Sequence, residues 1–303
     1  MRLTTLEALV LVEAHGSLRA VAQHMGLTQP ALTAAIQQLE QELQAPLLVR
    51  SKQGVTFTAF GQAFLRHAKL MVHQSRRASD EISQMRGLWA GTVKMAISPA
   101  IGLGLLPRAL RQFNQQHRQV QVQCRDGLYP GVAPLLRDGS IDFALTPVHR
   151  VTLEADLVAE ALYASEVVII AARDHPLATA TSLADLREGQ WVLSSPSRGP
   201  GAVIEEAFEA AGLGAPQVGM LCESFLALPG LIAASAHWLS TVPRIVYEHC
   251  AVKSQLAVVP VRDELPRPTI CTVRRHDMPL TPAALQLVAW IQHYALKQAA
   301  GRT

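Results

Sequence analysis

Three polar side chains recur every fourth residue between positions 29 and 37, in a pattern suited to reading the edges of DNA bases. Gln29, Thr33 and Gln37 would lie on one face of a helix, because residues four apart stack on the same side. Glutamine matches the donor and acceptor that adenine presents in the major groove, and threonine contacts several bases. The residue types and their spacing therefore predict a helix that contacts double-stranded DNA.

Two cations, Arg50 and Lys52, follow this segment and are candidates for phosphate contact. Phosphate contacts position a protein on DNA without reading its sequence. Two solvated loop cations are the alternative, and the neighbouring base-reading face favours phosphate contact. The residues that we expect against DNA are Ser17, Arg19, Thr28, Gln29, Pro30, Thr33, Gln37, Arg50 and Lys52.

A second group of candidate residues follows the predicted strands of the C-terminal half. Ligands of open α/β sheets bind at the carboxyl ends of strands, next to helix N-termini whose free N–H groups favour anions. Ser195 and Arg198 would meet an anionic group, and Tyr129 and Phe225 would pack on an aromatic ring. Hydroxyl groups of the set would donate hydrogen bonds. The full expected set is Ser98, Pro99, Tyr129, Thr146, Ser195, Arg198, Ser224, Phe225 and Val242.

The serines, Arg198 and Tyr129 of this second group also have an ordinary structural interpretation. Serine at the start of a helix is commonly a cap. Arg198 is equally a solvated loop cation, and Tyr129 is equally a partly buried core residue. The sequence leaves both interpretations open.

Residues 16 to 40 predict the two helices that would present the base-reading face. Ser17 is suited to cap the first helix, and Gly26 ends it with a positive φ. Thr28 caps the next helix, and Pro30 lies in its first turn, where a missing N–H costs nothing. The inward faces are predicted to hold Leu18, Val21, Ala22 and Met25, and then Leu32, Ile36, Leu39 and Leu43. This pattern indicates a helix-turn-helix, although a helical hairpin in an all-α domain also fits.

Elements on either side complete an N-terminal domain. A helix over residues 3–14 would cover the back of the helix-turn-helix, with Leu3, Leu6, Leu9 and Val10 inward. Short strands at 47–49 and 55–57 flank a turn at 52–54, which predicts a β-hairpin wing.

A long helix is expected from the cap at Thr58 to about Trp89. About 30 residues span roughly 45 Å in a helix. Its apolar seam is predicted to comprise Phe60, Phe64, Met71, Ala78, Ile82, Met85 and Trp89. A small domain cannot bury so long a seam, so we expect a coiled coil with a second copy. The resulting homodimer is what a palindromic DNA site requires.

From Gly91 onward, strands alternate with helices, which predicts an α/β domain with largely parallel sheets. Two such blocks, with the chain returning at the end, indicate two lobes and a cleft. The expected domains are a DNA-binding domain at 1–58, a linker and dimerisation helix at 59–90, and a two-lobed α/β domain at 91–303. Its lobes would be lobe I at 91–162 and 268–303, and lobe II at 163–267.

Composition and charge restrict the class of protein. The 303 residues are 49% hydrophobic and 17% charged, which indicates a folded protein of two or three domains. No apolar run is long enough for a bilayer, and the N-terminus does not resemble a signal peptide, so a cytoplasmic location without membrane partners is expected.

Residues 1–91 hold 9 Lys+Arg and 6 Asp+Glu and so carry the whole net charge of +3. Excess positive charge there has the sign that a phosphate-binding surface needs.

Catalytic and metal-binding patterns are missing from the sequence. The cysteines, Cys124, Cys222, Cys250 and Cys271, form no CxxC pair and have no zinc spacing, so no metal or cofactor is expected. No Ser/His/Asp or GxGxxG arrangement is present, so an enzyme is not expected. Reduced thiols are the simplest interpretation, and a redox-sensing cysteine pair stays an alternative.

The first sixty or so residues resemble those of the LysR-type transcriptional regulators. The matching residues are Leu6, Leu9, 16–18, Ala20, Ala22, 27–33, 36–40, Leu43, 46–50 and 58–61. The resemblance implies an N-terminal all-α winged helix-turn-helix, a long dimerising helix and a two-lobed domain similar to periplasmic binding proteins. It also implies a small effector held between the lobes, promoter DNA as partner, and a homodimer or homotetramer.

Within that family, the C-terminal half resembles regulators of toluenesulfonate degradation. The stretches concerned are 125–127, 129–130, 136–139, 198–201 and 223–229. This resemblance implies an aromatic sulfonate or carboxylate as effector and a role in aromatic compound degradation. Many members carry arginine in this part of the second helix, whereas this chain has Ala34-Ala35 and Gln37-Gln38. Base reading should therefore depend on Gln29, Thr33 and Gln37.

Overall fold

The computed structural model describes residues 1–51, 54–148, 153–196, 199 and 203–300. Lys52 and Arg198 lie outside the described residues. The chain divides into two compact units, Met1–Gly91 with Pro134–Asp142, and Thr92–Ala133 with Phe143–Thr303. The first unit holds the predicted helix-turn-helix, wing and long helix, and the second holds the α/β lobes.

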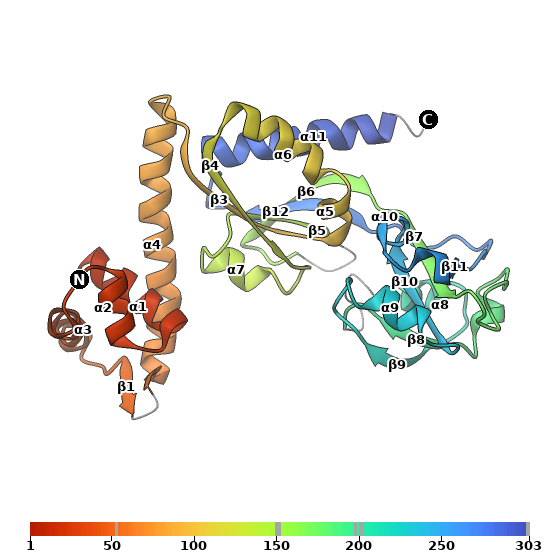
Figure 1. Cartoon of the computed structure of the whole chain (residues 1–303), viewed down its shortest axis with the longest axis horizontal. Coiled ribbons are helices and arrows are strands. Elements are labelled where there is room, and N and C mark those ends of the chain that lie inside the picture. The colour runs from red at the N-terminus through yellow and green to blue at the C-terminus, as the bar shows by residue number, and fades with distance from the viewer. Residues whose placement is uncertain (52–53, 149–152, 197–198, 200–202, 301–303) are drawn as a thin grey trace. The chain divides into compact units, whose positions relative to one another are not determined.

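Capping residues set the limits of the helices in the first unit. The Ser17 hydroxyl accepts a hydrogen bond from Ala20 N at 3.4 Å, and Thr28 does so from Ala31 N at 3.3 Å. Gly26 has a φ of 67°, which ends the turn between these helices as expected. The elements, shown in red to orange in Figure 1, are α1 (Leu3–His15), α2 (Leu18–His24), α3 (Gln29–Leu43), β1 (Leu48–Ser51), β2 (Gly54–Phe57) and α4 (Ala59–Met85).

One apolar core joins α1, α2, α3 and α4. Its fully buried side chains include Leu9, Val21, Leu32 and Ile36. The prediction was wrong for Leu3 and Leu43, which are exposed because they belong to terminal turns of α1 and α3 outside this core. Val12 and Ala8, which the periodicity did not assign inward, are buried instead.

The wing is an antiparallel pair of short strands. Leu48 lies opposite Phe57, and Arg50 lies opposite Val55 in the backbone register. The hairpin is anchored to the turn after α1, because Val55 N donates to Gly16 O at 3.0 Å. The predicted β-hairpin is therefore present.

Helix α4 is slightly shorter than expected, since Gly87, with a φ of 83°, turns the chain after Met85. Phe64 and Met71 from the predicted seam pack on the core of the first unit, so this middle part of the seam is not free for a second copy. Phe60, Ile82 and Met85 are exposed.

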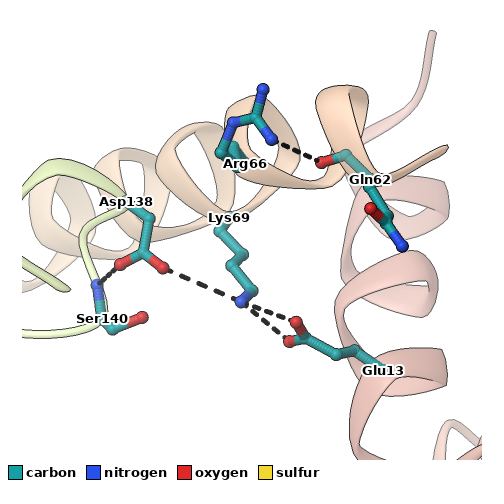
Figure 2. A network of polar contacts seen from close by, with 6 residues as sticks. All are labelled: Glu13, Gln62, Arg66, Lys69, Asp138 and Ser140. Atoms are coloured by element: carbon teal, nitrogen blue, oxygen red, sulfur yellow. Dashed lines mark hydrogen bonds and ion pairs between the residues drawn. The ribbon is translucent and has the colours of Figure 1, made fainter. Parts of the chain in front are cut away.

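The segment 134–142, which contains most of α7 (Ala133–Arg137), packs on α4. Lys69 Nζ lies 2.8 Å from Glu13 Oε2 of α1 and 3.8 Å from Asp138 Oδ2 (Figure 2). Deeper in the same contact, the Asp142 carboxylate faces His73 at 3.4 Å and Arg77 at 3.6 Å. This segment was expected to belong to the effector domain, and through these contacts with α4 it groups with the first compact unit.

The second unit contains two five-stranded sheets, one in each lobe. The lobe I sheet has the order β4-β3-β5-β12-β6 and is covered by α6 and α11, which lie side by side (Figure 1). Strand β6 stays in this sheet to Ala164, slightly beyond the expected boundary. The lobe I elements are β3 (Ala90–Ile97), α5 (Pro99–Leu103), α6 (Leu106–Gln116), β4 (Gln119–Asp126), β5 (Phe143–Val148), β6 (Leu157–Ala164), β12 (Thr269–Arg275) and α11 (Pro282–Ala300).

The lobe II sheet has the order β11-β7-β10-β8-β9 and an apolar core on each face. Successive residues of a strand point to opposite faces. Ile169 thus joins the core around Trp191 and α8, and Ile170 joins the core that includes α9 and α10. The lobe II elements are β7 (Val167–Ala172), η1 (Ala184–Leu186), β8 (Gln190–Leu193), α8 (Val203–Ala210), β9 (Gln217–Leu221), α9 (Leu228–Ala233), β10 (Trp238–Pro243), α10 (Arg244–His249), η2 (Lys253–Gln255) and β11 (Leu256–Val258).

Both sheets are mixed, whereas the sequence predicted largely parallel ones. β12 runs antiparallel to β5 and β6, and β7 runs antiparallel to β10 and β11. The alternation of strands and helices is present, but a strand that returns from the other lobe is free to pair in either direction.

Among the described residues, none of the helices has both the length and the apolar character that crossing a membrane requires.

Candidate functional site

The predicted base-reading face lies on α3 and is open to solvent. Gln29 and Gln37 are exposed, and Thr33 between them is half-buried. Pro30 lies in the first turn of α3, and Arg19 is exposed on α2. The core residues Leu32, Ile36 and Leu39 fix the opposite side of the helix, so the polar face cannot rotate inward. This part of the chain is a rigid, exposed polar helix.

The hydroxyl groups of Ser17 and Thr28 serve as helix caps, as described above. A cap accepts a hydrogen bond through its side-chain oxygen, so these residues have a structural role whether or not DNA is bound. Arg50 belongs to β1 by its backbone, and its neighbour Val49 is exposed.

A pocket in the second unit gathers residues from both lobes. It encloses about 450 Å³ of empty space, part of it open to solvent. Four of the predicted residues line it, namely Ser98, Pro99, Phe225 and Val242. The other lining residues are Ala100, Leu128, Pro147, Ser165, Val167, Ser194, Val203, Thr241, Pro243, Pro268 and Ile270.

Ser98 is the most informative residue of this pocket. It is only 2% exposed, and its Oγ has no hydrogen-bond partner among the described residues. It occupies the cap position of α5 without making the cap bond. A buried polar atom without a partner is costly, so its place at the pocket favours a bond to a bound molecule.

Four other predicted residues, Tyr129, Thr146, Ser195 and Ser224, do not line the pocket, and the hydroxyl groups of the last three are hydrogen-bonded within the fold. The Thr146 hydroxyl accepts from the backbone N–H of Tyr129 at 2.9 Å, and both residues are buried. Ser195 Oγ donates to the carbonyl of Pro196. Ser224 is exposed, and its hydroxyl accepts from Ala227 N in the turn before α9, whose N-cap residue is Ala227. Ligand contact at these four residues stays a prediction.

Comparison with known protein families decides the class of protein. Residues 3–62 match the model of the bacterial regulatory helix-turn-helix proteins of the lysR family. Residues 86–295, well over half of the chain, match the model of the LysR substrate binding domain. The chain belongs to the LysR family of transcriptional regulators.

Curated relatives cover nearly the whole regulator. The HTH-type transcriptional regulator GalR of Pseudomonas putida is 31% identical over 93% of this chain and 71% of its own length. The SDS degradation transcriptional activation protein of a Pseudomonas species is 29% identical over 93% of this chain and 92% of its own. These relatives are regulators and not enzymes, which agrees with the expectation from the sequence.

Solved structures share the fold. The crystal structure of CbnR, a LysR family transcriptional regulator, superimposes with a TM-score of 0.73 at 21% identity and covers 97% of this chain and 99% of its own. This likeness agrees with the predicted winged helix-turn-helix and two-lobed α/β domain. The two family matches, and not this likeness, make the regulator a DNA-binding protein with an effector-binding domain.

Sequence reasoning missed Ser165 and Thr241, which add hydroxyl groups to the pocket of the regulator. Thr241 lies within β10, beside the predicted Val242, whereas Ser165 follows β6, where the chain crosses from one sheet to the other. For Ser165 the change of sheet was the only available signal, and it depends on strand pairing that the sequence does not reveal. None of the described lining residues is charged, and Arg198 lies outside the described residues.

Proposed function

We propose that this regulator binds promoter DNA as a homodimer, or as a homotetramer built from such dimers, and that an effector in the pocket changes how it engages DNA. Gln29, Thr33 and Gln37 would read bases, and Arg50 and Lys52 would contact phosphates. A ligand shifts such an equilibrium only through its different affinities for the two states. The observation that carries the DNA-binding part is the exposed polar face of α3 above a fixed apolar core.

Substituting Gln29 with alanine is expected to relax sequence preference at one base pair of each half-site, by about 1 to 3 kcal/mol. Arg50→Ala is expected to weaken binding to all sequences alike and to reduce the dependence of log K on log salt by about 0.9. Fluorescence anisotropy with the promoter beside the regulator's gene and with single-base variants measures both. If Arg50→Ala alone changed sequence preference, this division of roles would be wrong.

For the effector we propose an aromatic anion, a sulfonate or a carboxylate. Apolar walls with Phe225 suit an aromatic ring, and Ser98, Ser165 and Thr241 would supply hydrogen bonds. Arg198, next along the chain to a lining loop, would supply positive charge. A relative named for SDS degradation supports a catabolic role.

Thermal unfolding with toluenesulfonate, benzenesulfonate and benzoate tests this ligand class. A compound present at 100 times its Kd raises the free energy of unfolding by about 2.7 kcal/mol. Ser98→Ala should reduce the shift in Tm, whereas Ser224→Ala, outside the pocket, should leave it unchanged. Should no aromatic anion shift the Tm while an aliphatic carboxylate does, the proposed ligand class is excluded.

Cysteine oxidation as the switch has weaker support. Cys271 is buried, and burial raises the pKa of its thiol, as it also does for Cys124. Because the thiolate is the reactive form, a raised pKa slows oxidation. A cysteine-free variant should therefore keep its normal response in a reporter strain.

A further inference from the structure

We infer that Glu40 is a positioning residue that fixes the wing relative to the base-reading helix α3. This inference rests on the proposed DNA binding and extends it to a residue outside the DNA-contact set. Glu40 lies in the last part of α3, directly after the buried Leu39. Its Oε1 accepts hydrogen bonds from Leu47 N at 2.7 Å and Leu48 N at 3.1 Å. Bonds from amides to a carboxylate are stronger than neutral ones.

The two amides belong to the start of the wing. Leu48 is the first residue of β1, and Arg50 follows two residues later. The antiparallel register then fixes Val55 and the rest of β2 opposite it. The bonds from Glu40 therefore fix the position of the first residue of β1 relative to α3, two residues before Arg50.

The same short segment is held from its other side by the start of α4. Leu47 O accepts from Thr58 N at 2.9 Å, and Pro46 O accepts from the Thr58 hydroxyl at 2.6 Å. A Cβ built at Gly61 would lie 2.0 Å from Leu47 O, so the backbones of α4 and residue 47 are in close contact. Glu40 supplies the matching attachment to α3. Without it, the hydrogen bonds described for residues 46 and 47 would come from the start of α4 alone, while the buried Leu47 side chain would still pack in the core.

Charge makes this role testable. A carboxylate on a DNA-binding domain repels phosphate, so electrostatics alone predicts that removing its charge strengthens binding. A positioning role predicts instead that binding depends on the reach of the side chain. Aspartate keeps the charge but is one methylene shorter, and glutamine keeps the length and an oxygen that accepts both bonds.

The experiment measures promoter binding by Glu40→Asp and Glu40→Gln in the full-length protein across a salt series. We expect Glu40→Asp to bind about tenfold more weakly, with a shallower salt dependence, because the wing loses phosphate contact. Glu40→Gln should bind at least as well as the unsubstituted protein. In a background that lacks both wing cations, Arg50→Ala with Lys52→Ala, Glu40→Asp should cause little further loss, since the contacts that it positions are already absent.

Glu81→Gln on α4 is the matched control for charge, because Glu81 is exposed in the same unit. Unchanged binding by Glu40→Asp, or a loss fully additive with Arg50→Ala and Lys52→Ala together, would overturn the inference. Weaker binding by Glu40→Gln than by Glu40→Asp would also overturn it. If the unsubstituted protein shows no preference for promoter over random DNA, the proposed function fails instead, and the two failures are distinct.

Discussion

Replacing Asp142 with alanine is expected to lower the free energy of unfolding by about 3 to 5 kcal/mol. The Asp142 side chain is 3% exposed and faces His73 Nε2 at 3.4 Å and Arg77 Nε at 3.6 Å. Both partners are also largely buried on α4. Removing the carboxylate leaves a buried guanidinium without this counter-charge, and that penalty exceeds the worth of the pair itself. Urea unfolding followed by circular dichroism measures the loss.

Two comparisons separate this explanation from a general effect of mutating the segment 134–142. Asp138→Ala removes a more distant ion pair, at 3.8 Å from the partly exposed Lys69, and should cost less than about 1 kcal/mol. Replacing the whole cluster, as His73→Leu, Arg77→Met and Asp142→Leu, should recover much of the stability, because no buried charge is then left behind. Equal losses for Asp138→Ala and Asp142→Ala would contradict a role for buried charge.

The elements of the DNA-binding unit were predictable because their signals are local. Ser17, Gly26 and Thr28 act within three or four residues of their position, and the structure contains the caps and the left-handed turn that they indicated. The wing followed in the same way, from a turn between two short apolar runs. Such features depend on backbone geometry and capping, which few distant contacts can override.

The pocket was predicted only in part, because burial and pairing depend on distant segments. Ser98 and Ser224 have the same type of sequence signal, a serine before a helix. The Ser224 hydroxyl accepts from Ala227 N within a turn, outside the pocket, whereas the Ser98 hydroxyl makes no cap bond and is buried at the pocket. The inclusion of segment 134–142 in the DNA-binding unit was equally hidden, since it depends on His73 and Asp142, far apart in the sequence.

Introducing lysine at both Ile82 and Met85 is expected to produce a monomer and to weaken binding to a palindromic site by about 100- to 10,000-fold. Ile82 is 59% exposed and Met85 is 72% exposed, at the end of a helix whose middle part already packs on its own core. Two cations there would oppose pairing with a second copy through this seam. A dimer gains this factor because binding of its second half is intramolecular. Sedimentation and anisotropy measure the two effects.

The control places the same two charges elsewhere on α4, as Gln74→Lys with Ser79→Lys, at exposed positions outside the apolar seam. Added positive charge alone strengthens binding to DNA, so the control should stay dimeric and bind at least as tightly. The seam variant should keep its binding to an isolated half-site, because the core around α3 is untouched. A seam variant that stayed dimeric with full affinity for the palindrome would show that copies associate through another surface. In that case the exposed end of α4 would not explain how two base-reading helices are held on one site.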